Sequence, residues 1–176
     1  MMKLNARQLR TTEPDPQIIK SIKKNPIYII LDNVLDTYNV GSIFRLADAV
    51  ASEQILLCGE TLVPPNPRIK KASINTTGWV DWKYFESAKY AISNLKSQIS
   101  NLNVVVVEQH SKSIPINEYK PKFPLALVVG NETYGVAKEV LNMADTVVEL
   151  PMFGVNKSLN VMVSLGIVLY KIVEFL

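Results

Sequence analysis

Cysteine and histidine are almost absent from this sequence of 176 residues, which contains only Cys58 and His110. A single cysteine excludes an internal disulfide, and one cysteine with one histidine is a poor basis for a zinc site. A Ser-His-Asp triad would have to use His110, which follows a predicted strand and is expected to be a surface residue. We therefore predict no metal site, and the single cysteine fits a reducing, cytoplasmic location.

Long apolar runs are also missing. The most apolar segment, from Leu159 to Tyr170, would be about 18 Å long as a helix, whereas the hydrocarbon core of a bilayer is about 30 Å thick. The segment from Met1 to Lys24 is polar and charged, with no apolar leader. We therefore expect no membrane association.

The common nucleotide-binding fingerprints are absent as well. Neither G-x-G-x-x-G nor G-x-x-x-x-G-K-[ST] occurs in the chain. Their absence argues against an NAD-dependent oxidoreductase and against a P-loop ATPase.

Apolar runs alternate with segments of helical periodicity, which predicts an α/β fold with a mostly parallel sheet and helices on both faces. Four consecutive valines, Val104 to Val107, are typical of a central strand buried on both sides. The other predicted strands are Ile27–Leu31, Gln54–Cys58, Val80–Phe85, Leu125–Val129 and Thr146–Leu150, and the predicted helices are Asn39–Val50, Ser87–Ile99, Val136–Met143 and Leu159–Phe175.

Basic residues are concentrated in two places although the net charge is only +3. Residues 1–25 contain six basic and two acidic residues, and we interpret them as a basic N-terminal arm, partly helical from Pro16 to Lys23, before a single domain at 26–176. Arg68, Lys70 and Lys71 form the second cluster, among hydroxyl and amide side chains. Such clusters suit contacts with RNA phosphates, and a merely solvated surface is the alternative.

Three polar segments are candidates for a binding site. The first runs from Asn39 to Arg45, where Asn39 is expected to cap a helix and Gly41 suggests close approach by another chain or a ligand. Arg45 is expected to project from a face of the helix other than the buried apolar one, with an ion pair to Asp48 as the ordinary alternative.

The second and third segments each follow a predicted strand. Gly130-Asn131-Glu132 places a carboxylate near a helix N-terminus. Leu150 to Val161 carries a polar cluster at the start of a very apolar helix, although Ser158 could simply be its N-cap. Since open α/β sheets bind ligands beyond the carboxyl ends of their strands, both segments are placed where a ligand is expected.

Together, and in this order, the three segments resemble the motifs of the SpoU-type (TrmH-like) RNA ribose 2′-O-methyltransferases of the SPOUT superfamily. The matching residues are Asn39 through Arg45; Gly130-Asn131-Glu132 with Gly135; and Leu150-Pro151-Met152, Gly154 and Ser158-Leu159-Asn160-Val161 with the following helix. The resemblance extends from about Ile27 to Phe175.

This resemblance implies a C-terminal trefoil knot, a homodimer, S-adenosylmethionine as cofactor, and tRNA or, second, rRNA as substrate. The implied cofactor-binding residues are Val107, Glu108, Gly130, Leu150, Met152, Ser158 and Leu159. The implied catalytic residues are Asn39, Arg45, Glu132, Ser158 and Asn160, with Arg45 facing the cofactor of the other subunit.

Guanidinium groups stay protonated, so we expect Arg45 to grip a substrate phosphate rather than act as a base. Asn39, Ser158 and Asn160 are then expected to hold the reacting ribose, and Glu132 to position Arg45 or its loop. Two alternatives remain open at this stage: an RNA-binding module of the same fold without methyl transfer, and an oxidoreductase without the usual dinucleotide fingerprint.

Overall fold

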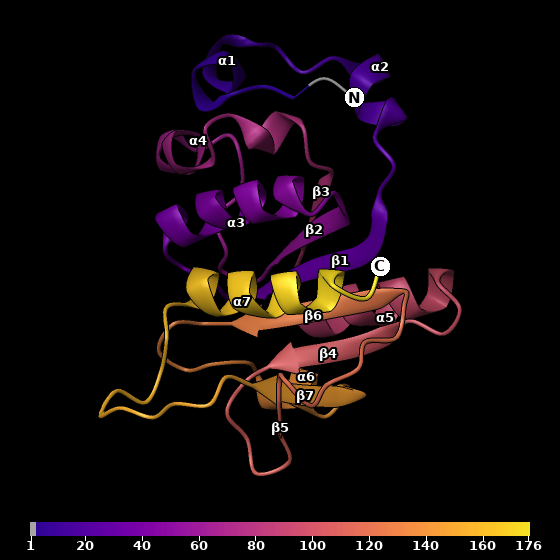
Figure 1. The fold of residues 1–176 in the computed structure, drawn as a ribbon, viewed down its shortest axis with the longest axis vertical. Helices are drawn as coiled ribbons and strands as arrows, with labels where there is room; N and C mark the ends of the chain where they lie inside the picture. Colours follow the sequence, from indigo (N-terminus) through magenta and orange to yellow (C-terminus); the bar gives the residue numbers. More distant parts are fainter. Residues whose placement is uncertain (1–2) are drawn as a thin grey trace.

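The computed structural model describes residues 3–176; Met1 and Met2, the first residues of the predicted arm, lie outside the described part. Its centre is a seven-stranded sheet in the order β3-β2-β1-β6-β4-β7-β5, in which every pair of neighbouring strands is parallel (Figure 1). The strands are β1 Asn25–Asp32, β2 Ser52–Cys58, β3 Trp82–Phe85, β4 Asn103–Val107, β5 Ile114–Pro115, β6 Leu125–Gly130 and β7 Thr146–Glu149.

Helices cover both faces of this sheet, which confirms the predicted fold class. The helical segments are α1 Ala6–Thr11, α2 Pro16–Ser21, α3 Thr37–Ala49, α4 Pro67–Ser73, the 3₁₀ turn η1 Thr76–Gly78, α5 Ala88–Gln98, α6 Lys138–Leu141 and α7 Val161–Val173. Helices α3 and α7 pack on one face, and α5 and α6 pack on the other.

The central strands are buried on both faces because their side chains alternate between two apolar clusters. Ile29 and Leu31 of β1 face α3 and α7, whereas Ile30 faces α5. All six residues of β6 are buried. The strongest apolar runs of the sequence therefore occupy the middle of the sheet.

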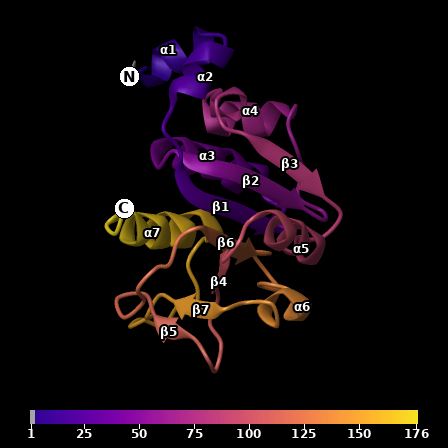
Figure 2. The same cartoon turned by 90° about the vertical axis from the view of Figure 1, so that its right-hand side faces the viewer.

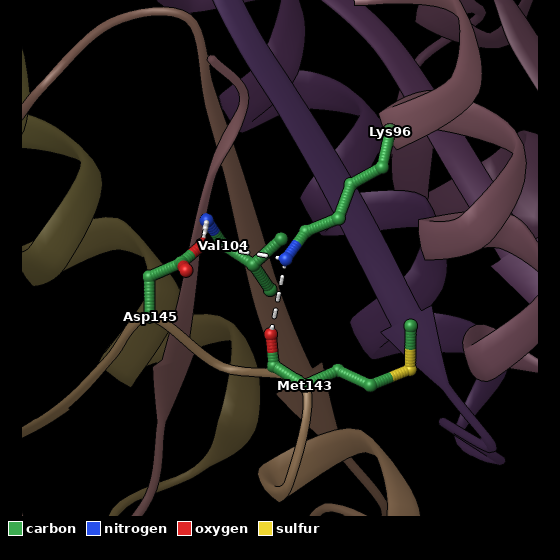
Figure 3. A network of polar contacts seen from close by, with 4 residues as sticks. All are labelled: Lys96, Val104, Met143 and Asp145. Atoms are coloured by element: carbon green, nitrogen blue, oxygen red, sulfur yellow. Dashed lines mark hydrogen bonds and ion pairs between the residues drawn. The ribbon is translucent and has the colours of Figure 1, made fainter. Parts of the chain in front are cut away.

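At the amino end of β4, the chain satisfies its own polar groups (Figure 3). The Asp145 carboxylate accepts a hydrogen bond of 2.8 Å from the Val104 amide. Lys96 of α5 lies 3.6 Å from the same carboxylate and donates to the Met143 carbonyl at 3.4 Å. This end of β4 is tied to α5 and to the segment before β7.

The N-terminal arm is folded against the body of the molecule (Figure 2). Helix α2 lies inside the predicted range Pro16–Lys23, whereas α1 and α4 were not predicted. Both missed helices begin with a recognisable cap: Asn5 forms a capping box with Gln8, and Asn66 caps a helix whose first residue is Pro67.

The last helix, α7, begins two residues later than predicted, at Val161, and packs beside α3. Gly166 of α7 faces Leu46 of α3, whose methyl groups would lie 3.5 Å from an added Cβ. Within residues 3–176, no helix has both the length and the apolar character needed to cross a bilayer.

Candidate functional site

A cavity of about 560 Å³ opens beyond the carboxyl ends of β4, β6 and β7. It is lined by the ends of these strands, the loop after β6, and the segment between β7 and α7. The lining includes Val107, Glu108, Gly130, Glu132, Leu150, Met152, Ser158, Leu159 and Asn160. Every residue predicted to bind the cofactor is thus part of one cavity, while the contact that each makes with a ligand stays a prediction.

The loop after β6 is closed by its own backbone. The amides of Asn131 and Gly135 each donate to the other residue's carbonyl, at 3.0 and 2.9 Å. A Cβ on Gly130 would collide with the Gly135 backbone, and Gly135 itself adopts a φ of +69°. The glycines are therefore required by the fold of this loop.

The Glu132 carboxylate connects this loop to the start of α3. It accepts hydrogen bonds of 3.1 Å from the backbone amides of Leu35 and Asp36 and from the Asn39 side chain. Partial burial acts to raise the pKa of Glu132, but these donors outweigh it and hold the pKa below its ordinary value. Glu132 is therefore ionised and fixed in place at neutral pH.

Asn39 extends the connection to α7. Its side-chain oxygen accepts a 3.0 Å hydrogen bond from Asn160, whose own oxygen caps α7 by accepting from the amides of Met162 and Val163. The predicted cap of α3 is therefore wrong, since Asp36 caps this helix, and the alternative of Ser158 as the cap of α7 is excluded, since Asn160 caps it. Asn39 is a buried residue of the first turn that links Glu132 to Asn160.

Two further carboxylates hold the end of the same loop. Glu108 accepts from the Val136 amide at 3.0 Å, and the buried Asp32 accepts from the Ala137 amide at 2.9 Å. Burial raises the pKa of Asp32, although hydrogen bonds from Ala137 and Asn33 oppose this shift. Asp32 was not predicted as a site residue, although its position directly after an apolar strand was the available signal.

Arg45 lies outside the lining of the cavity, with an exposed side chain. Helix periodicity puts it on the same outer ridge of α3 as Tyr38, between the side facing α4 and the side facing α7. The alternative ion pair with Asp48 is not formed within residues 3–176. Within one subunit, Arg45 is therefore separate from the other site residues.

Gly41 of α3 is needed by the chain itself. An added Cβ would lie 2.6 Å from the Ala72 Cβ and 2.7 Å from the Ile69 carbonyl oxygen of α4. The close approach expected at Gly41 is therefore made by α4 and not by a ligand or another chain.

The segment between β7 and α7 has few contacts with the rest of the molecule. Phe153 and Val155 are 98% and 102% exposed, and no atom lies within 4 Å of a Cβ built on Gly154. A hydrogen bond from the Gln109 side chain to the Lys157 carbonyl is its main link to β4. Gln109 was not predicted as a site residue, although it too follows a strand.

Known proteins are similar to this chain in sequence and in fold. Residues 26–170 match the SpoU rRNA Methylase family. The tRNA (guanosine(18)-2′-O)-methyltransferase of Aquifex aeolicus is 30% identical over 153 residues, which cover 85% of this chain and 69% of the relative. The 23S rRNA (guanosine-2′-O-)-methyltransferase of Haemophilus influenzae is 28% identical over 163 residues, covering 92% of this chain and 65% of that protein.

Solved structures agree with the family match. The AdoMet-bound rRNA methyltransferase from Sinorhizobium meliloti superposes with a TM-score of 0.76 at 26% identity, covering 93% of this chain and 58% of that one. The chain thus spans about three fifths to seven tenths of the length of these three proteins. With its motifs, fold and family match in agreement, the chain belongs to the SpoU rRNA methylase family.

Proposed function

We propose that this chain transfers a methyl group from S-adenosylmethionine to a ribose 2′-hydroxyl of a structured RNA, with tRNA ahead of rRNA as substrate. The observation that carries the proposal is the cavity where the second and third motifs meet and to which Asn39 of the first is hydrogen-bonded. Relatives with this fold are named as tRNA and rRNA ribose methyltransferases, and one was solved with AdoMet bound. Nothing in the structure favours an RNA-binding module without turnover.

The residues present fit this cofactor. The cavity volume of about 560 Å³ falls within the range of about 300–1,000 Å³ that is typical of small-molecule sites. Leu150, Met152 and Leu159 offer apolar surface for a purine ring, and the backbone around Gly130 offers hydrogen-bonding groups. The carboxylates of Glu108 and Glu149 suit a ligand with cationic groups.

When bound, S-adenosylmethionine supplies an electrophilic methyl group on a sulfonium centre. The task of the protein is to hold the ribose hydroxyl in line with that methyl group, and positioning of this kind lowers barriers by about 7–11 kcal/mol in favourable cases. Asn160 lines the cavity and is held there by a hydrogen bond to Asn39, which is buried, lies outside the lining and is fixed in turn by Glu132. We assign ribose positioning to Ser158 and Asn160, and to Asn39 through its hydrogen bond with Asn160.

Arg45 is assigned to a substrate phosphate. Its guanidinium can bind a phosphate through two parallel hydrogen bonds, which fixes orientation as well as charge. Since Arg45 is exposed and outside the cavity of its own subunit, we assign it to the cavity of a partner subunit. Glu132 acts through the loop and through Asn39.

A homodimer is part of this proposal. Helix α7 exposes Val163, Ile167 and Tyr170, which lie along one face at intervals of four and three residues. Tyr38, on the same outer ridge of α3 as Arg45, is also exposed. A second copy packed on these side chains would bury apolar surface and bring Arg45 near a neighbouring site.

The trefoil knot and the cytoplasmic location also remain proposals. The knot is supported by the family and by the path of the chain, which runs outward after β7 and returns to pack α7 against α3 (Figure 1). The proposed location is supported by the proposed RNA substrate and by the single cysteine of the sequence, which fits a reducing compartment.

The substitution Arg45→Lys tests the proposed function. Lysine keeps the positive charge but cannot form the two parallel hydrogen bonds of a guanidinium. We therefore expect the rate of methyl transfer to unmodified tRNA to fall about 100-fold, because the substrate is no longer held in the reactive position. The AdoMet Kd, measured by calorimetry, is expected to stay unchanged. The assay uses AdoMet with a labelled methyl group and identifies the product nucleoside by mass spectrometry. A near-parental rate with Arg45→Lys would contradict the assignment of Arg45 to a substrate phosphate. If the parental protein forms no 2′-O-methyl nucleoside, the proposed function is wrong.

A further inference from the structure

The N-terminal arm is held at a defined place on the body. The side chain of Asn75, between α4 and η1, donates hydrogen bonds to the carbonyls of Leu9 at 3.2 Å and Thr12 at 3.3 Å. The Pro14 ring packs against Gly78, where an added Cβ would lie 2.5 Å from the Pro14 Cγ. The turn after α4 therefore fixes α1 beside α4.

This docking joins the two basic clusters of the sequence. Helices α1 and α4 lie at the same end of the molecule in both views (Figures 1 and 2). Neither helix contains an acidic residue. We call their five exposed basic residues the basic surface; they are Arg7, Arg10, Arg68, Lys70 and Lys71.

The basic surface forms no ion pair with the carboxylates of the described residues. The ion pairs within residues 3–176 involve Lys89, Lys96 and Lys171, and none involves the basic surface. Docking one basic helix beside another costs Coulomb energy, which a bound polyanion would offset. A purely solvating role would not require an arm fixed by Asn75 and Pro14.

We propose that α1 and α4 together bind phosphates of the RNA backbone away from the reacting nucleotide. This inference rests on the proposed function, since it assigns a second contact region to the same substrate. Helix α3 packs between α4 and α7 and carries Arg45 on its outer ridge. An RNA strand on the basic surface would therefore continue across α3 toward the dimer site.

The paired substitution Lys70→Ala/Lys71→Ala tests the surface. The probe is unfractionated tRNA, and binding is measured by fluorescence anisotropy at several salt concentrations. We expect affinity to fall about tenfold and the slope of log K against log salt to shrink by about 2, one for each lost phosphate contact. The matched control is Lys120→Ala/Lys122→Ala, which removes the same charge beside the amino ends of β4 and β7.

The substitution Asn75→Gly tests whether the arm and α4 act as one surface. Asn75 has a φ of +73°, which glycine adopts freely, so the change removes the two hydrogen bonds without adding strain. We expect faster tryptic cleavage within the arm and tRNA binding about threefold weaker, although no charge is lost. Asn101→Gly, at a φ of +59°, is the matched control and is expected to change neither.

AdoMet calorimetry on each variant separates the two proposals. If the Lys70/Lys71 variant binds AdoMet and also binds tRNA with parental affinity and salt slope, the basic surface is not an RNA contact. If the parental protein binds tRNA but no AdoMet, and the Lys70/Lys71 variant binds tRNA more weakly, the proposed function fails while RNA binding by the basic surface stands.

Discussion

The two walls of the cavity are built differently. We call residues 130–136, with Asn160, the fixed wall; Asn39 lies behind it and is hydrogen-bonded to Glu132 and Asn160. Its loop is closed by backbone hydrogen bonds and is tied by Glu132 and Glu108 to α3 and β4. We call residues 151–159 the open wall, where Phe153 and Val155 are fully exposed and a Cβ added to Gly154 would meet no atom within 4 Å.

The difference indicates how binding energy is distributed. The fixed wall loses its conformational entropy during folding, so its polar groups are already in place when a ligand binds. The open wall makes few contacts of its own and must be ordered by what it binds. The contrast predicts a pocket with a rigid floor and a segment that closes on the cofactor.

Two single glycine substitutions, one in each wall, are expected to give the largest difference in Tm. In Gly130→Ala, the new methyl group collides with the Gly135 backbone, and overpacking of this kind costs about 1–3 kcal/mol. We expect a lower Tm and loss of AdoMet binding. Gly154→Ala has open space around it and is expected to keep the parental Tm. Equal Tm changes in the two variants, measured by calorimetry, would contradict the distinction.

Glu132→Gln should weaken the fixed wall in a pH-dependent way. Because the folded pKa of Glu132 is depressed, its ionised form stabilises the fold above its ordinary pKa of 4.5, and this contribution is lost as the pH falls through the folded pKa. At pH 7 we expect the Tm to drop by about 2–4 °C, the shift for a loss of about 1 kcal/mol in a chain of this size.

The difference in Tm between parental protein and Glu132→Gln should narrow below about pH 4.5, the ordinary value for this group. Glu86→Gln, at an exposed carboxylate outside the site, serves as the control and should change little at any pH. If the difference in Tm between the parental protein and Glu132→Gln is constant from pH 7 to pH 3.5, ionisation of Glu132 does not stabilise the loop.

Hydrogen exchange with and without AdoMet sharpens the comparison at the level of segments. At a ligand concentration of 100 times Kd, protection of residues 153–159 should rise by up to about 100-fold. Residues 133–136 should change much less, because the amides of 133, 134 and 135 are already hydrogen-bonded to Asn131 and that of Val136 to Glu108. An equal ligand-induced increase in protection in both walls would show that the fixed wall is also ordered by the ligand.

The sheet and its main helices could be predicted because their signals are local. The valine run at 104–107 indicates a buried strand and the apolar spacing of α5 indicates a helix, each from residues that are close together in the sequence. The two missed helices have signals as well, in the Asn5–Gln8 capping box and in Asn66-Pro67. Both helices are short, however, and most of their exposed side chains are polar. Periodicity alone does not detect such helices.

The contacts within the site could not be predicted from spacing. Asn39 and Glu132 are 93 residues apart, and Asn39 and Asn160 are 121 apart. Only the parallel order of the strands brings them together. The resemblance identified these residues, whereas the structure shows that Asn39 is a buried link and that Arg45 lies outside the cavity of its own subunit.

Calorimetric titration of the full chain with S-adenosylmethionine tests the central claim most directly. We predict one molecule bound per subunit, a negative heat-capacity change from burial of apolar surface, and loss of binding in Gly130→Ala but not in Gly154→Ala. A folded chain that binds neither S-adenosylmethionine nor its demethylated product would contradict the account.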